Sequence, residues 1–189
     1  MKKNRKITEY LKLMTYVISI FIATWLLWRF VAAPTVVDGS SMFPTLANNE
    51  KLIVDKISYL KGDPQRFDII VFREDASSTG YFIKRVIGLP GETVFIDKGG
   101  VIFIDGEVIG DVYGFEPIEN RGVTAASVTL GEDEYFVLGD NRNNSEDSRY
   151  KEIGNIKRSD IYGRVFVRLT PFERFGYPDL YRERTEAKS

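Results

Sequence analysis

The chain has 189 residues, with 26 Lys plus Arg, 27 Asp plus Glu, no histidine and no cysteine. This length predicts one domain, and 43% hydrophobic residues are enough to build a core. The lack of histidine excludes a Ser-His-Asp triad, and the lack of cysteine excludes disulfides and a thiolate nucleophile. Together the two absences exclude the usual tetrahedral zinc site. A hydrolase of this composition must use Ser or Thr with Lys, a carboxylate pair, or an oxygen-ligated metal.

The charge is distributed unevenly along the chain. Residues 1–12 carry five basic side chains against Glu9, a net of +4, whereas residues 32–189 hold 20 basic and 26 acidic side chains, a net of −6. An acidic body without a basic stripe argues against nucleic-acid binding. A basic tip in front of a long apolar run indicates a membrane partner instead.

The stretch from Leu13 to Ala33 is apolar apart from Arg29. As a helix, its 21 residues span about 31 Å, which matches the hydrocarbon thickness of a bilayer. The basic residues before it place residues 1–12 in the cytoplasm and the body outside. The alternative is a cleavable signal peptide ending at Ala33, but Pro34 after the cut suits a protease poorly, so a transmembrane anchor is the preferred interpretation.

Beyond Pro34 the hydrophobic pattern changes to an alternation of period two, which predicts a mainly β body over residues 34–176. The expected strands are Lys51–Lys56, Asp68–Arg73, Tyr81–Gly88, Thr93–Asp97, Val101–Ile104, Glu134–Leu138 and Tyr162–Leu169. Asp105-Gly106 is typical of a two-residue hairpin turn. Residues 97–130 read as an inserted β excursion, and residues 177–189 as a charged tail that frays.

Two short segments carry groups suited to nucleophilic chemistry. Ser40 and Ser41 are adjacent in a turn, and such hydroxyls usually serve the turn itself. Lys84 shares one strand face with Phe82 and Val86. This placement fits an edge-strand or snorkelling lysine as well as a desolvated lysine with a lowered pKa that acts as a base.

A third segment, residues 139–150 (GDNRNNSEDSRY), directly follows a predicted strand. Its oxygen-bearing side chains Asp140, Asn144 and Glu146 could ligate calcium, but their spacing does not match an EF-hand loop. A structural polar loop is the simpler interpretation of this segment taken alone.

In this order and spacing, SSMFPTL just after an apolar N-terminal run, KRVIGLPGE and GDNRNNSEDSR resemble bacterial type I signal peptidase. The resemblance covers nearly the whole chain, and the short body is most similar to the compact enzymes of Gram-positive bacteria. It implies a signal-peptidase-like β core behind one transmembrane helix. The implied function is that of a membrane-anchored serine endopeptidase that removes signal peptides from exported preproteins with a Ser/Lys dyad and no metal or cofactor.

The resemblance assigns roles residue by residue. Ser41 matches the nucleophile, Lys84 the general base and Ser145 the serine that hydrogen-bonds and orients the lysine. The supporting residues are an ion pair and two side chains that brace the loop, namely Asp147 with Arg149, and Asp140 and Arg142. The family's second oxyanion donor is in many members a serine hydroxyl, whose position here is occupied by Gly39. The shallow apolar pockets that accept small residues at −1 and −3 of the substrate have Met42, Leu46 and Ile83 as candidate lining residues.

Two other functions compete with this one. A Ser/Lys self-cleaving repressor protease shares the chemistry, but the anchor and the lack of a DNA-binding module argue against it. A non-catalytic membrane-tethered assembly factor for surface structures such as pili would have lost the serine or the lysine, and both are present.

Overall fold

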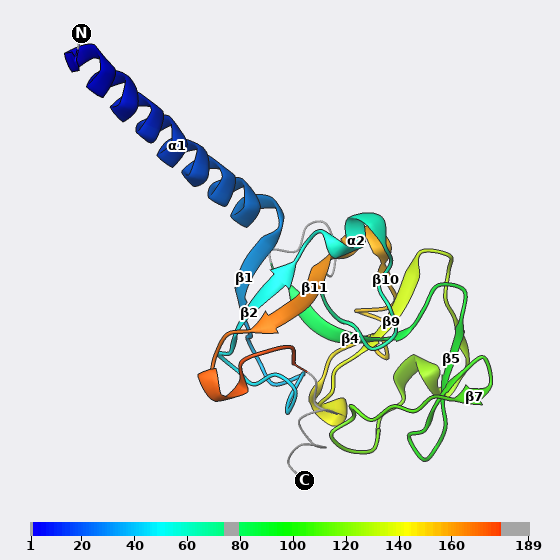
Figure 1. Cartoon of the computed structure of the whole chain (residues 1–189). Helices are drawn as coiled ribbons and strands as arrows, with labels where there is room; N and C mark the ends of the chain where they lie inside the picture. The colour runs from blue at the N-terminus through cyan, green and yellow to red at the C-terminus, as the bar shows by residue number, and fades with distance from the viewer. Residues whose placement is uncertain (1, 74–79, 179–189) are drawn as a thin grey trace.

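The computed structural model describes residues 2–73 and 80–178, without the side chains of residues 2–5 and 27–29. Its first element is a long helix, α1 (Lys2–Phe30), which projects away from a β-rich body (Figure 1). Within α1, Lys6–Leu26 has a mean hydropathy of 1.3 and no buried side chain, so it is long and apolar enough to cross a membrane. The predicted charged tail lies outside the described residues from position 179 onward.

The helix ends three residues before the predicted end of the apolar run at Ala33. Ala32–Val36 forms a strand, β1, which pairs antiparallel with β2 (Lys51–Asp55). Pro34 explains the boundary, because a proline disfavours helical geometry in the residue before it and its missing N–H is tolerated on an edge strand. The apolar sequence is therefore shared between a helix and the edge of a sheet.

Among the described residues, the body contains two antiparallel sheets. The larger has the strand order β1-β2-β11-β3-β4-β9-β10 and the smaller the order β7-β6-β5-β8. The remaining strands of the larger sheet are β3 (Ile69–Phe72), β4 (Phe82–Gly88), β9 (Glu134–Leu138), β10 (Ile156–Lys157) and β11 (Ile161–Arg168). The smaller sheet comprises β5 (Thr93–Ile96), β6 (Ile102–Ile104), β7 (Glu107–Val108) and β8 (Val128–Thr129).

The helical elements of the body are short. They are the α-helical turn α2 (Ser58–Lys61) and the 3-10 turns η1 (Gly122–Ala125), η2 (Arg142–Asn144), η3 (Arg158–Asp160) and η4 (Phe172–Arg174). The prediction of a mainly β fold behind an N-terminal apolar helix is confirmed. The inserted excursion already begins with β5, at Thr93, because β5 pairs with β6 and β8 rather than with the larger sheet. In Figure 1 this smaller sheet lies on the side of the body away from β1.

Alternation along β3 divides the core of the larger sheet. Ile69 and Val71 belong to one apolar cluster, and Ile70 and Phe72 belong to another. A third cluster joins the smaller sheet to the ends of β4 and β9, and its members are Ile87, Val94, Ile96, Ile102, Ile104, Ile118, Leu130, Phe136 and Leu138. Because β4 contributes to two of these clusters, it is held rigidly in the middle of the body.

Candidate active site

Ser41 lies in the turn that connects β1 to β2. Two backbone hydrogen bonds define this turn, from Phe43 N to Ser40 O at 3.0 Å and from Leu46 N to Met42 O at 2.8 Å. The buried hydroxyl of Thr45 donates to the carboxylate of Asp140, which ties the turn to the loop after β9. The turn is therefore fixed both locally and by a residue about 100 positions away.

Lys84 comes from the middle of β4 and points at this turn. Its Nζ lies 2.8 Å from Ser41 Oγ. β4 pairs with β3 on one side and β9 on the other, so Lys84 is not an edge-strand lysine. Its side chain is 4% exposed, and Nζ lies 5.7 Å from the centroid of the Phe82 ring.

Burial gives this lysine an unusual acidity. Desolvation disfavours the ammonium form and lowers the pKa of Lys84 to about 8, although the nearby charges of Asp147 and Glu146 act in the opposite direction. A pKa of about 8 leaves about one lysine in ten neutral at pH 7, against a few in ten thousand for a free lysine. Ser41 and Lys84 therefore form a hydroxyl–amine pair with the geometry and acidity that proton transfer requires.

Ser145 lines the same cavity, but its side-chain hydroxyl makes no hydrogen bond among the described residues. Its Oγ is buried and has no partner among the described residues. The prediction that Ser145 hydrogen-bonds Lys84 is therefore not met in this conformation. Gly139 explains how the hydroxyl comes so close to the site: a Cβ at position 139 would lie 2.2 Å from Ser145 Oγ and 2.4 Å from Ser41 O. Only glycine lets these three segments meet here.

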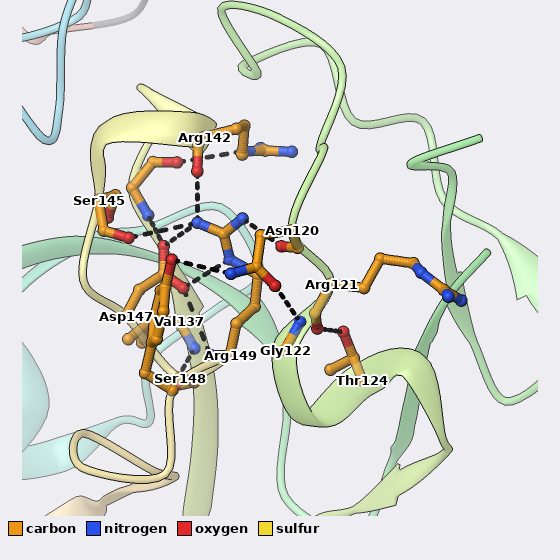
Figure 2. A network of polar contacts seen from close by, with 12 residues as sticks. Asn120, Arg121, Gly122, Thr124, Val137, Arg142, Ser145, Asp147, Ser148 and Arg149 are labelled. Carbon is orange, nitrogen blue, oxygen red and sulfur yellow. Dashed lines mark hydrogen bonds and ion pairs between the residues drawn. The ribbon is translucent and has the colours of Figure 1, made fainter. Parts of the chain in front are cut away.

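Asp147 and Arg149 form the ion pair that the resemblance implies. Arg149 Nε donates to Asp147 Oδ1 at 2.8 Å and Nη2 donates to Oδ2 at 2.9 Å, and both side chains are buried. The same guanidinium donates to the backbone carbonyls of Asn120 and Arg142, so it joins two loops at one point (Figure 2). Asp147 Oδ2 also accepts from Gly139 N at 3.1 Å, which fixes the start of the loop that carries Ser145.

Asp140 and Arg142 brace the same loop through partners on other elements. Asp140 accepts two hydrogen bonds from Arg85, at 2.8 and 2.6 Å, and Arg142 pairs with Asp111 at 2.5 Å. Arg85 was not predicted as a site residue, although it adjoins Lys84 in the sequence. Its side chain points to the opposite face of β4, where it ties the strand to Asp140. Because both Asp140 oxygens are engaged by Arg85, this residue does not offer a free carboxylate for calcium.

A cavity of about 390 Å³ opens beside the Ser41–Lys84 pair. Its lining comprises Asp38, Gly39, Ser40, Ser41, Phe82, Lys84, Asn143, Asn144, Ser145, Glu146 and Tyr150. Met42 and Leu46 are instead buried in the apolar cluster beneath the turn, and Ile83 packs against that cluster. The three predicted pocket residues thus lie together behind Ser41, whereas the open cavity is lined mainly by polar residues.

The backbone N–H groups of Gly39 and Ser41 differ in their hydrogen bonding. Gly39 N donates to the side-chain oxygen of Asn48 at 3.0 Å, so it is already used. Ser41 N donates none of the hydrogen bonds found among the described residues. The side chain of Asn144 donates to Ser40 Oγ at 2.9 Å, which holds the residue before the nucleophile against the loop.

Comparison with known proteins links this arrangement to one family. A family model described as signal peptidase, peptidase S26, matches residues 7–170. The chain is 42% identical to a probable signal peptidase I-2 of Synechocystis sp. over 164 residues, which cover 83% of this chain and 72% of that protein. It is 33% identical to signal peptidase I P of Bacillus subtilis subsp. natto over 180 residues, which cover 92% and 96% of the two chains.

Among solved structures, the chain is similar to a signal peptidase I from Enterococcus faecalis V583. The two are 37% identical, and the superposition has a TM-score of 0.44 over 55% of this chain and 97% of the other.

Proposed function

Because this chain belongs to the peptidase S26 family of signal peptidases, we propose that Ser41 and Lys84 are the catalytic dyad with which it cuts signal peptides from preproteins. The family makes it a serine endopeptidase and a hydrolase. The observation that carries the assignment of the dyad is the 2.8 Å contact between Lys84 Nζ and Ser41 Oγ. No other described lysine is as deeply buried, because Lys84 alone among them is in the buried class.

The dyad accounts for both halves of the hydrolysis. Neutral Lys84 takes the proton of Ser41 Oγ while Oγ attacks the scissile carbonyl carbon. The resulting ammonium returns that proton to the amine of the mature protein as the peptide C–N bond breaks, which leaves the signal peptide esterified to Ser41. Lys84 then takes a proton from water, whose oxygen attacks the ester carbonyl carbon. The ammonium returns this proton to Ser41 Oγ as the ester C–O bond breaks, which restores the dyad, and the released acid of the signal peptide loses its proton to solvent.

The free N–H of Ser41 is the proposed oxyanion donor. It belongs to the nucleophile itself and makes no other hydrogen bond among the described residues, so it is available to the developing negative charge. Gly39 supplies no hydroxyl, and its N–H is engaged by Asn48. The chain therefore lacks the serine donor that many relatives have at that position.

Substrate preference concerns the cavity beside Ser41. Met42 and Leu46 are 2% and 0% exposed and so cannot contact a substrate in this conformation, whereas Ile83 is partly exposed. We propose that small side chains at −1 and −3 of the signal peptide enter the cavity that Ser41 and Phe82 help to line, and that large side chains are excluded there by steric clash.

The helix α1 is the proposed membrane anchor, with residues 1–12 on the cytoplasmic side and the catalytic domain outside. Ser41 lies eleven residues after Phe30, the last residue of α1, and the intervening β1 ties it to the body. Such an anchor keeps the dyad near the membrane surface at which signal peptides emerge.

The decisive experiment incubates the purified full-length protein in detergent with a secretory precursor and sequences the N-terminus of the product. Cleavage after an alanine at −1 is expected, together with loss of cleavage in Ser41→Ala and after alanine-to-phenylalanine substitution at −1. The rate constant kcat/KM should rise with pH through an apparent pKa of about 8, because only the neutral amine accepts the proton. A folded protein that leaves the precursor uncut would favour the non-catalytic assembly factor.

Orientation has its own measurement. Protease added outside intact spheroplasts should digest the catalytic domain and spare the first residues of the chain. Protection of the domain would contradict the proposed topology without bearing on the dyad.

A further inference from the structure

The chain after β11 folds back onto the turn that carries Ser41. Arg168 ends β11 and exchanges backbone hydrogen bonds with Gly176, at 2.8 Å from Arg168 N to Gly176 O and 3.1 Å in reverse. These bonds close a loop that contains η4 and is called here the C-terminal clamp, residues 168–176. The proposed reaction does not involve this segment, yet two of its side chains reach the turn between β1 and β2 that carries Ser41.

The two arginines of the clamp converge on the backbone of that turn. Arg174 Nη2 donates to Pro44 O at 2.9 Å and to Thr45 O at 3.1 Å. Arg168 Nη1 donates to the same Thr45 carbonyl at 2.9 Å, and its Nε donates to Arg174 O at 2.6 Å. Arg168 is 1% exposed, so this carbonyl is held by two guanidinium groups in a largely water-free environment.

A buried carboxylate completes the arrangement. Glu50, at the end of the turn before β2, is 4% exposed and accepts from Arg174 Nη1 at 2.7 Å. Its second oxygen lies 3.8 Å from Arg168 Nη1. Arg174 uses two nitrogens of its planar fork to reach the carboxylate and the two carbonyls, whereas the three donors of an ammonium group all lie on one nitrogen.

Thr45 is also held from the side of the base. Its hydroxyl donates to Asp140, which in turn is bound by Arg85, the residue after Lys84 on β4. One end of Thr45 is thus linked to the strand that carries the base, and its carbonyl is linked to the C-terminal clamp. The turn has no regular secondary structure of its own, so these contacts, together with those that Asn141 and Asn144 make to Ser40 and Ser41, set where it lies relative to β4.

We propose that Arg174 is a positioning residue for the nucleophile: the C-terminal clamp holds the Ser41 turn at the distance from Lys84 that proton transfer requires. The proposal rests on the proposed Ser/Lys dyad. Misplacing a reacting group by about 1 Å costs about 100-fold in rate, so loss of the clamp should act on turnover rather than on substrate affinity. The pKa of Lys84 should be unaffected, because its causes are burial on β4 and the charges of Asp147 and Glu146.

A matched control exists elsewhere in the molecule. Arg158 also sits in a 3-10 turn, η3, and also binds one carboxylate, Asp63, and two backbone carbonyls, those of Tyr59 and Gly62. Its side chain is 27% exposed, against 30% for Arg174. None of its partners belongs to the active site, so Arg158→Ala also removes one carboxylate contact and two carbonyl contacts, from an exposed carboxylate in this case, without touching the turn of Ser41.

The experiment compares Arg174→Ala, Arg174→Lys and Arg158→Ala in the full-length protein. For each variant, kcat and KM on a precursor peptide, the pH profile of kcat/KM and the unfolding midpoint are measured. Arg174→Ala should lower kcat by about 10- to 100-fold with KM within about twofold and the same apparent pKa, and Arg174→Lys should recover only part of the loss. Millimolar guanidinium ion should restore part of the activity of Arg174→Ala.

Arg158→Ala should keep kcat within about twofold even if its midpoint falls as far as that of Arg174→Ala, because its lost contacts affect stability alone. The proposal is overturned if Arg174→Ala retains wild-type kcat, or if the two variants lose equal activity at equal loss of stability. Activity remaining in Ser41→Ala would instead overturn the dyad, which separates the two failures.

Discussion

The two sheets bury different kinds of residue. In the described part of the chain, every buried charged side chain lies outside residues 93–129, which contain the smaller sheet. That sheet contributes mainly aliphatic side chains to its core cluster, whereas the larger sheet and its loops bury Lys84, Arg85, Asp140 and Arg149. Burying a charged side chain lowers the free energy of unfolding unless the charge is well paired. The larger sheet and its loops therefore bear this cost while holding their charged side chains in fixed positions. The smaller sheet acts as a support.

Polar contacts join this support to the site at the loop after β9. Arg142 reaches Asp111, and Arg149 donates to the carbonyl of Asn120 at 2.9 Å (Figure 2). Both arginines come from the loop that also carries Ser145. We therefore expect the smaller sheet to influence the proposed dyad through the position of this loop, while the larger sheet carries Lys84 and flanks the turn of Ser41 directly.

The largest expected effect tests whether the larger sheet carries the base. The contrast between the two sheets would fail if Lys84 could be replaced by another cation without loss of activity. Lys84→Arg keeps the positive charge, but a guanidinium stays protonated at any usable pH and cannot accept the Ser41 proton. We expect kcat/KM to fall by about 10⁴-fold or more, as for other residues that act as one catalytic unit. The measurement is cleavage of a precursor peptide, with the circular dichroism spectrum as a check of folding. Retention of most of the activity would remove Lys84 from the role of base.

The next largest effect distinguishes the two regions by stability. Asp147→Asn leaves the buried guanidinium of Arg149 without its carboxylate, and breaking such a pair costs about 3 to 5 kcal/mol of unfolding free energy. Ile104→Val in the smaller sheet removes one buried methyl group and should cost about 1 kcal/mol. Urea unfolding of both variants gives the two values, and equal costs would contradict the contrast drawn between the sheets.

Lys84 should also destabilise the fold at neutral pH. Its pKa is about 8 in the folded chain and about 10.5 in the unfolded chain, so between these values the unfolded chain binds more protons and stability rises with pH. This difference in pKa lowers the free energy of unfolding by about 3 kcal/mol below pH 8, and the loss disappears above pH 10.5. Lys84→Met should therefore be more stable than the wild type by about 3 kcal/mol at pH 7, with the advantage fading towards pH 11.

Urea titrations at pH 7, 9 and 10.5 measure this trend, and Lys56→Met, at a half-buried lysine outside the site, is the control. A constant difference between Lys84→Met and the wild type across this range would show that the lysine is not desolvated.

The sequence predicts those parts of the fold that depend on local pattern. The apolar pattern locates the long strands, such as Phe82–Gly88, although side chains on both faces of this strand are buried. The pattern does not reveal that β4 is a central strand, because that depends on its pairing with β9, about 50 residues later in the chain. The sequence alone therefore cannot decide whether Lys84 is buried. The strand β1 is hidden because its alanines continue the apolar run of α1, and Pro34 is the only local sign of the change.

The contacts that support the site are harder to predict, because they join residues far apart in the chain. Arg85 meets Asp140 and Arg174 meets Pro44 only after the sheet has formed. The motif around Ser41 and the loop at 139–150 are visible in the sequence, but their arginine partners look like ordinary surface residues there. Motifs identify the reacting groups, and the fold identifies what holds them.

The smallest expected effect concerns Ser145, at the junction of the two regions. Among the described residues its buried hydroxyl has no hydrogen-bond partner, which is unfavourable, and removing it leaves none of them unpaired. Ser145→Ala should therefore be as stable as the wild type or more stable by up to about 1 kcal/mol. Catalytic hydrogen bonds often form only as the reaction proceeds, and the Lys84 ammonium, once it has taken the Ser41 proton, has this hydroxyl in the same cavity. Losing that one bond predicts a fall in kcat of about tenfold.

Stopped assays for kcat and thermal unfolding of Ser145→Ala and Ser148→Ala measure the two effects side by side. Ser148 Oγ accepts from Val137 N at 3.0 Å, so its removal leaves a buried donor unpaired and should lower stability without a direct effect on Lys84. If Ser145→Ala instead loses as much activity as Lys84→Arg, the hydroxyl is part of the proton transfer itself. If it loses stability as Ser148→Ala does, the hydroxyl has a structural partner in solution, and the argument from its unpaired state is wrong.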